Sequence, residues 1–286
     1  MSASPRLVQQ VIEPQSVLEG AGVRLNRSIG TQALDYLDPF LLFDAFTSKH
    51  RHEYEAGFPL HPHRGIETVT YILEGEVQHK DTLGNAGSIG AGDLQWMTAG
   101  RGIMHEEMPQ VHPEGLMGFQ LWVNLPARLK MTEPRYQDIR SDHIPEITHK
   151  DGAKIRVIAG TVDGVKGPML GIAADPTYLD VFIPPHSSFS LPIERGQPLF
   201  AYVFAGAARF QQMNRNQQLI SHPHLIVFGD GDSANVKTEF HSVRFLLVAG
   251  KPLGEPIARY GPFVMNTKNE IEQTLVELRE GTFVTA

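Results

Sequence analysis

The chain has 286 residues, long enough for one large or two medium domains with a well-buried core. Its net charge of −7, with no concentrated run of Lys and Arg, argues against direct nucleic-acid binding. It contains no Cys, which excludes disulfides, thiolate zinc sites and Cys nucleophiles, so any metal must be held by His, Asp or Glu.

The first residues, "MSASPRLVQQVIEP", contain no apolar core of signal-peptide length. No run of about 18 apolar residues occurs in the chain, so we expect no membrane-spanning helix. Together with the lack of Cys, these features predict a cytoplasmic protein without a membrane partner.

Short runs rich in Val, Ile, Phe and Tyr recur along the chain, separated by Gly and Pro. They are "TVTYILEGEVQHKD" (68–81), "GFQLWVNL" (118–125), "AKIRVIAG" (153–160), "YLDVFIP" (178–184), "LFAYVFAGAARF" (199–210) and "VRFLLVAG" (243–250). Runs of this length, bounded by turn residues, are typical of antiparallel strands in a sandwich or barrel. "DTLGN" (81–85) and "GDGD" (229–232) are typical of hairpin turns.

One helix is predicted near the end of the chain, in "NTKNEIEQTLVELREG" (266–281). Asn or Thr provides the cap, and Gly281 ends the helix. The apolar face consists of Ile271, Leu275, Val276 and Leu278. The fold is therefore predicted to be all-β with a short C-terminal helix.

An internal repeat predicts two similar halves. Residues 68–81 resemble residues 199–212, because each is an apolar strand with Tyr, then Gly, then a second strand. The polar, Pro-containing segment 131–153 is the natural join. We expect two tandem β domains, residues 1–135 and 136–286, with the helix in the second.

Two pairs of potential metal ligands lie about forty residues apart, in "LHPHRGIE" (60–67) and "GRGIMHEEMP" (100–109). Residues i and i+2 of a strand point to the same face, so His61 and His63 share a direction, as do His105 and Glu107. If the strands are neighbours and both pairs face inward, four ligands converge. Three imidazoles and one carboxylate suit Fe(II), Mn(II), Ni(II), Cu(II) or Zn(II).

A more ordinary interpretation stays open, because a lone His-x-His is common on strand surfaces. Glu67 is also a candidate, since it lies four residues after His63 and keeps the same parity. It would serve as the carboxylate ligand in place of Glu107, or would orient a ligand imidazole. Glu106 should face away from the ion.

The run "HPHRGIETVTYILEGEVQHKDTLGNAGSIGAGDLQWMTAGRGIMHEEMP" (61–109) closely resembles the pirin family, and "GEPIARYGPFVMNTKNEIEQTL" (254–275) is similar to its C-terminal segment. The resemblance implies a bicupin, two antiparallel β-barrels of the cupin or jelly-roll type in tandem. It also implies one metal ion in the N-terminal barrel, held by His61, His63, His105 and Glu107. The family pattern thus favours Glu107 over Glu67. Iron(II) is the expected ion, with Mn, Ni, Cu, Zn and Co as other divalent ions.

The second half departs from this ligand pattern. Superposing the Gly75 and Gly206 turns places Pro192 and Glu194 at the positions of His61 and His63, and Val236 at that of His105. His222 and His224 form another His-x-His, but they follow the repeat strands instead of preceding them. We expect no metal in the C-terminal barrel.

The resemblance implies two functions of different classes. Some pirins resemble quercetinases, which open a flavonol ring with O₂ and release carbon monoxide. Here the metal would act as a Lewis acid, and Glu107 would be the catalytic residue that accepts the 3-hydroxyl proton. Animal pirins are instead regarded as metal-dependent cofactors of transcription factors, which implies a protein partner. A pocket that admits a two-ring aromatic would favour catalysis.

Five other residues near the two ligand pairs are given expected roles. Arg64 either meets an anionic or phenolic substrate or pairs with a local acid, and Arg101 is expected to stabilise its turn. Trp96 and Met97 are expected to pack the barrel. Phe58 is expected to form a pocket wall.

Overall fold

The computed structural model describes residues 4–212 and 218–284, and strands dominate this part of the chain. The chain forms two compact units. The N-unit comprises Gln15–Ser141 and Leu253–Ala286, and the C-unit comprises Met1–Pro14 and Asp142–Pro252. No helix among the described residues is long and apolar enough to cross a bilayer.

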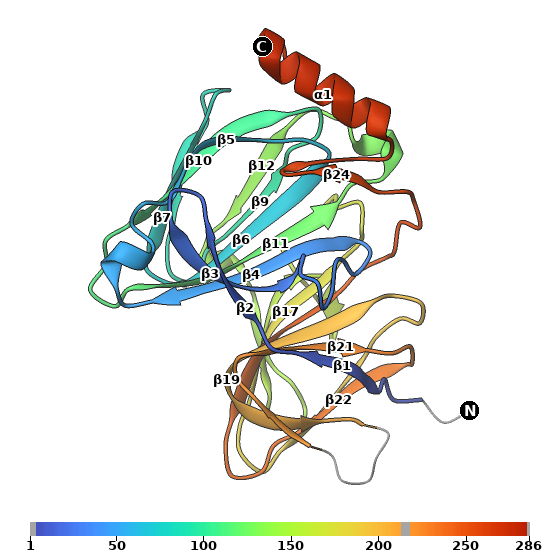
Figure 1. Cartoon of the computed structure of the whole chain (residues 1–286). Helices are drawn as coiled ribbons and strands as arrows, with labels where there is room; N and C mark the ends of the chain where they lie inside the picture. The colour runs from blue at the N-terminus through green and yellow to red at the C-terminus, as the bar shows by residue number, and fades with distance from the viewer. Residues whose placement is uncertain (1–3, 213–217, 285–286) are drawn as a thin grey trace. The chain divides into compact units, whose positions relative to one another are not determined.

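The N-unit contains two large antiparallel sheets (Figure 1). The larger has seven strands in the order β12 (Arg135–Ile139), β9 (Leu94–Thr98), β6 (Ile66–Glu74), β11 (Leu116–Asn124), β4 (Phe40–Ser48), β3 (Val23–Ile29) and β2 (Gln15–Glu19). The smaller has four strands in the order β5 (Phe58–His63), β10 (Ile103–Gln110), β7 (Glu76–Asp81) and β8 (Ala86–Ile89). A short pair, β24 (Ala258–Tyr260) and β25 (Phe263–Met265), and helix α1 (Lys268–Glu280) complete the unit.

The two sheets of the N-unit enclose a common interior. Apolar side chains from both sheets pack together, among them Leu25, Ile72 and Leu116 of the larger sheet and Val77 and Ile89 of the smaller. Inward-pointing residues alternate with outward-pointing ones along each strand. Residues of β5 and β10 that face inward therefore also face the larger sheet.

The C-unit has a ten-stranded sheet whose main path is β1 (Val8–Ile12), β21 (His224–Phe228), β19 (Leu199–Phe210), β23 (Val243–Ala249), β17 (Thr177–Ile183), β14 (Lys154–Ala159) and β13 (Glu146–Thr148). Strands β18 (Ser188–Pro192), β20 (Leu219–Ser221) and β22 (Ser233–Lys237) lie off this path, and β15 (Thr161–Val162) pairs with β16 (Val165–Lys166). Val236 lies opposite Phe189 on paired strands, and both belong to a large apolar core. The position expected to match His105 is thus part of a hydrocarbon interior.

The two units are not divided at residue 135, because each of them contains a segment from the opposite end of the chain. Strand β1 pairs with β21, so the N-terminus belongs to the C-unit. Strand β12 pairs with β9 and stays in the N-unit, which ends its first segment at Ser141. Helix α1 also belongs to the N-unit, where its apolar face packs on β24 and β25 (Figure 1). Contacts between segments that are distant in sequence decide which unit contains β1, β12 and α1. The composition of the chain does not reveal these contacts.

The predicted helix is confirmed. Thr267 caps α1, accepting a hydrogen bond from the backbone of Glu270, whose side chain reaches back to the Thr267 backbone. Gly281 ends the helix with φ of +72°, the left-handed conformation that glycine adopts without strain. The turn at 81–85 joins the paired strands β7 and β8. The "GDGD" prediction was wrong: β21 and β22 do not pair with each other, so that turn is not a hairpin.

Candidate metal centre

Strands β5 and β10 bring the two ligand pairs of the sequence together. They pair antiparallel, with His105 opposite His61 and Ile103 opposite His63. The register shifts by a bulge after His105, so Glu107 lies opposite Phe58. Along β10, burial alternates strictly, which confirms that His105 and Glu107 share the inward face.

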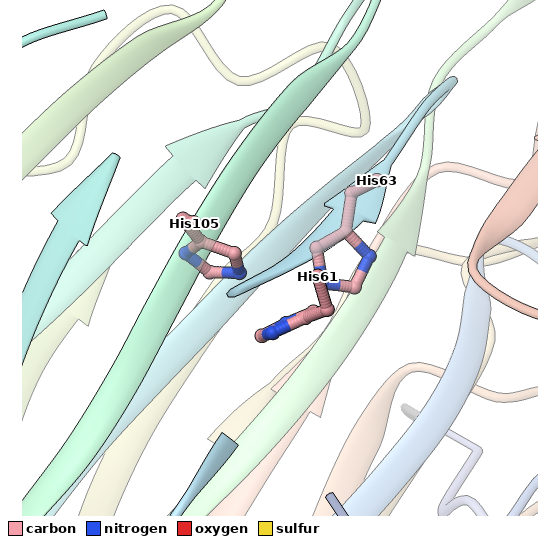
Figure 2. Close-up of side chains that lie close together, drawn as sticks. All are labelled: His61, His63 and His105. Carbon is pink, nitrogen blue, oxygen red and sulfur yellow. The ribbon is translucent and has the colours of Figure 1, made fainter. Parts of the chain in front are cut away.

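The three imidazole rings gather at one point of the interior (Figure 2). One ring nitrogen from each of His61, His63 and His105 lies within 4.8 Å of the others. Ring centroids are 4.5 Å apart for His61 and His105, 4.9 Å for His61 and His63, and 5.1 Å for His63 and His105. Side chains placed this closely can share one ion after small rotations, since metal–nitrogen bonds are about 2.0–2.1 Å long.

The protonation chemistry of the rings fits a metal. Burial, followed by repulsion from the two other rings, lowers the pKa of His63 well below its ordinary value. Burial also lowers the pKa of His105 to about 4. Both rings are therefore neutral near pH 7 and carry lone pairs. Nδ1 of His63 and both ring nitrogens of His105 are buried without a hydrogen-bond partner among the described residues.

His61 is oriented by its own strand. Its Nδ1 lies 2.9 Å from the carbonyl oxygen of Pro59. A carbonyl only accepts, so Nδ1 is the donor and Nε2 is left with the lone pair. A backbone hydrogen bond on the far nitrogen is the usual way in which a ligand imidazole is held.

Glu107 lies on the same face but outside the 4.8 Å group of rings. Thr70 Oγ1 donates to its Oε1 at 3.1 Å, and Gln120 Nε2 lies 3.2 and 3.1 Å from its two oxygens. The carboxylate is thus held by donors of the larger sheet, β6 and β11. It lines the same cavity as His61 and His63.

Glu67 faces away from this centre. Strand β5 ends at His63, Gly65 adopts φ of +77°, and β6 begins at Ile66 in the other sheet, so parity does not carry across the turn. Within β6, Thr70 points to Glu107, and Glu67 has the opposite parity. Its carboxyl group is buried and accepts a hydrogen bond from Thr98 at 2.8 Å. Burial raises its pKa.

The remaining candidates have structural roles. Arg64 is buried and faces helix α1, where its guanidinium forms an ion pair with Glu277 at 2.7 Å and lies 4.5 Å from the Phe283 ring centroid. Arg101, in the turn after β9, forms an ion pair with the more distant Glu133 at 2.9 Å. Two further expectations are confirmed: Trp96 and Met97 are fully buried, and Phe58 lines the cavity.

The cavity has a volume of about 650 Å³. Its lining includes Leu25, Leu42, Phe58, His61, His63, Glu107, Gln120 and Trp122, together with the charged residues Glu19, Arg27, Asp44 and Arg259. Trp122 packs edge-to-face on His63, with ring centroids 5.1 Å apart. The centre therefore opens into a space that is partly aromatic and partly charged.

Sequence reasoning missed a row of polar residues across the larger sheet. Arg27, Asp44, Gln120 and Thr70 are successive cross-strand partners on β3, β4, β11 and β6. The available signal was a polar residue inside an apolar run, as in "LLFDAF" (41–46) and "GFQLWVNL" (118–125). Such interruptions are uncommon in buried strands because an unpaired polar group there is costly.

A family model described as Pirin matches residues 22–123, and one described as Pirin C-terminal cupin domain matches residues 178–284. A pirin-like protein of Caulobacter vibrioides is 41% identical over 279 residues, covering 97% of this chain and 99% of the relative. Pirin of Homo sapiens is 43% identical over 282 residues, covering 98% and 94%. A solved structure of quercetin 2,3-dioxygenase from Acinetobacter baumannii matches with a TM-score of 0.87 and 33% identity, covering 99% of each chain. These matches confirm the resemblance and the fold class.

Proposed function

This chain belongs to the pirin family, and we propose that it is a metal-dependent dioxygenase that opens a flavonol-type phenol with O₂. One observation carries the proposal: an imidazole cluster and a carboxylate border a cavity of about 650 Å³. Cavities of this size bind small organic ligands. The Acinetobacter baumannii structure, which is named as a quercetin 2,3-dioxygenase, supports the choice of reaction.

We propose that one divalent ion, iron(II) in the first place, is held by His61, His63 and His105, with Glu107 as the fourth ligand. Imidazole and carboxylate donors also accept Mn, Ni, Cu, Zn and Co, so the donor set itself does not select iron. When bound, the ion would supply Lewis-acid activation of the flavonol oxygen.

In this proposal Glu107 accepts the proton of the substrate 3-hydroxyl group. Thr70 and Gln120 fix the direction of its carboxylate through hydrogen bonds, so the base does not have to reorganise during the reaction. Phe58 and Trp122 provide aromatic walls for a planar substrate. The net reaction consumes one flavonol and one O₂ and yields one depside and one carbon monoxide, with no other reductant.

The regulatory alternative uses the same ligands. A metal-dependent partner of a transcription factor or a metabolic enzyme needs no space for an aromatic substrate beside the ion. The cavity bordered by His61, His63 and Glu107 therefore supports the enzymatic proposal more than the regulatory one.

The test is anaerobic reconstitution with each divalent ion, followed by quercetin and O₂. We expect depside and carbon monoxide in equal amounts, at rates above those of the free ion. The double variant His61→Ala/His63→Ala should lose this activity. The double variant His222→Ala/His224→Ala, which removes a distant His-x-His pair, is the matched control and should keep it. If no ion gives turnover above background, the enzymatic proposal fails and the regulatory alternative remains.

A further inference from the structure

Two arginines line the cavity, and among the described residues only one of them, Arg27, forms ion pairs with carboxylates. Arg27 forms two hydrogen bonds with Asp44, at 2.9 and 2.8 Å, and an ion pair with Glu19 at 2.8 Å. This is the fork-to-carboxylate geometry in which a guanidinium is fully engaged. Arg27 therefore has little capacity left for a ligand.

Arg259, on β24, is engaged far less. Its Nη1 donates to the carbonyl of Leu41 at 3.3 Å and its Nε to that of Gly261 at 3.4 Å, both at the long end of the hydrogen-bond range. Among residues 4–212 and 218–284, no carboxylate forms an ion pair with it, and Nη2 has no hydrogen-bond acceptor. An arginine that is partly exposed, and whose Nη2 has no acceptor among the described residues, thus lines the cavity.

One aromatic side chain contacts both Arg259 and the imidazole cluster. The guanidinium carbon lies 5.2 Å from the Trp122 ring centroid, in a cation–π contact, and Trp122 packs against His63. One indole therefore separates the free guanidinium from the imidazole cluster. Arg259, Trp122, His61 and His63 all line the same cavity, so a planar ligand in it can contact both the guanidinium and the imidazole cluster.

The charges around Arg259 are mixed. Burial and then repulsion from the Arg27 guanidinium lower the pKa of Arg259, while the carboxylates of Asp35, Asp44 and Glu19 act in the opposite direction. Among the described residues none of these carboxylates forms an ion pair with Arg259, so its donors stay available to an anionic ligand. Guanidinium binds carboxylate and similar planar anions through two parallel hydrogen bonds.

We propose that Arg259 is a specificity-determining residue that binds an anionic oxygen group on a planar phenolic substrate, remote from the oxygen that faces the imidazole cluster. The group is a carboxylate or an ionised catechol. This inference rests on the proposed function for the orientation of the substrate. It narrows the substrate class to aromatic anions.

The test is a binding measurement that does not depend on turnover. Zn(II)-loaded protein is titrated under anaerobic conditions, by calorimetry, with 3-hydroxyflavone, with its 4′-carboxylate derivative and with quercetin. The wild-type protein should bind the carboxylate about tenfold more tightly than the neutral compound, a modest factor because Arg259 is partly exposed to solvent. Arg259→Gln should abolish that preference and leave the affinity for 3-hydroxyflavone within about twofold of the wild type.

Controls separate recognition from a structural effect. Arg24→Gln, which removes a surface arginine paired with Glu53, should leave the preference unchanged. Arg259→Lys should restore part of it, and zinc content and melting temperature should match the wild type for every variant compared. A preference for quercetin at pH values that ionise its catechol, but none for the carboxylate, would identify the catechol as the group bound.

Two outcomes overturn the inference: no preference in the wild type for either anionic compound, or equal losses for neutral and anionic ligands in Arg259→Gln. Its failure is distinguishable from failure of the proposed function. Depside formation without any anion preference would refute the role of Arg259 alone. Anion preference without depside formation would refute the reaction and leave the binding site standing.

Discussion

His61 and His105 lie directly opposite each other on strands β5 and β10, with their ring centroids 4.5 Å apart. Directly opposite residues on one face of an antiparallel pair are the closest cross-strand neighbours. The pairing places the two rings side by side without help from loops. His63 joins them from the next inward position of β5.

Removing one ring should remove the ion. His105→Ala is expected to lower metal affinity at least about 100-fold. Only two imidazoles would remain, and the carboxylate of Glu107 is already held by Thr70 and Gln120. Metal content after dialysis against a weak chelator gives the measurement. His222→Ala, in an exposed loop of the C-unit, should retain metal as the wild type does. Equal metal content in the two variants would contradict the assignment.

Glu107→Gln should separate binding from catalysis. The amide keeps the shape of the side chain but cannot accept the substrate proton, so we expect turnover to fall about 10²- to 10⁴-fold. The three imidazoles should still hold the ion, with a weaker affinity. Glu106→Gln, one residue away on the outward face of β10, is the matched control and should change neither quantity. Undiminished turnover in Glu107→Gln would refute its role as base.

Arg64 should matter for the attachment of α1. It is buried against the helix through Glu277 and Thr274, so Arg64→Met removes a buried cation and leaves its partners unpaired. We expect a loss of about 3–5 kcal/mol from the local stability of this contact. Hydrogen exchange of residues 268–280 should become faster. Arg279→Met, on an exposed position of the same helix, should have little effect, and similar exchange in both variants would refute this role.

Glu67 should make stability depend on pH. Its pKa in the folded state is raised above the ordinary value of 4.5, mainly by burial. Between those two pKa values the folded state retains a proton that the unfolded state has lost, so stability falls as the pH rises through this window. Glu67→Gln removes this dependence of stability on pH. The melting temperature of the variant minus that of the wild type should therefore increase from pH 4 to pH 8. A difference that is constant with pH would contradict the burial argument.

The sequence predicts that His61, His63 and His105 come together because the positions of these rings follow a local rule. In His61-x-His63 and His105-x-Glu107, strand alternation alone places each pair on one face. Helix α1 is equally local, since Thr267, Glu270 and Gly281 mark its ends within one segment. Glu67 shows where the rule stops: a single turn at Gly65 moves the chain to the other sheet and cancels the parity.

The rest of the site depends on register between distant strands. Thr70, Gln120 and Asp44 become neighbours only because β6, β11 and β4 pair in one particular alignment. Arg259 reaches the cavity from the C-terminal segment, which joins the N-unit. No pattern within one strand encodes these contacts, so they could not be predicted before the structure.

The most direct test of the metal centre is a crystal structure of the metal-loaded protein, with diffraction data collected on both sides of the absorption edge of the ion. The predicted result is one anomalous peak in the N-unit, bonded to one ring nitrogen each of His61, His63 and His105. A peak bound by fewer than these three rings, or one located in the C-unit, would contradict the account.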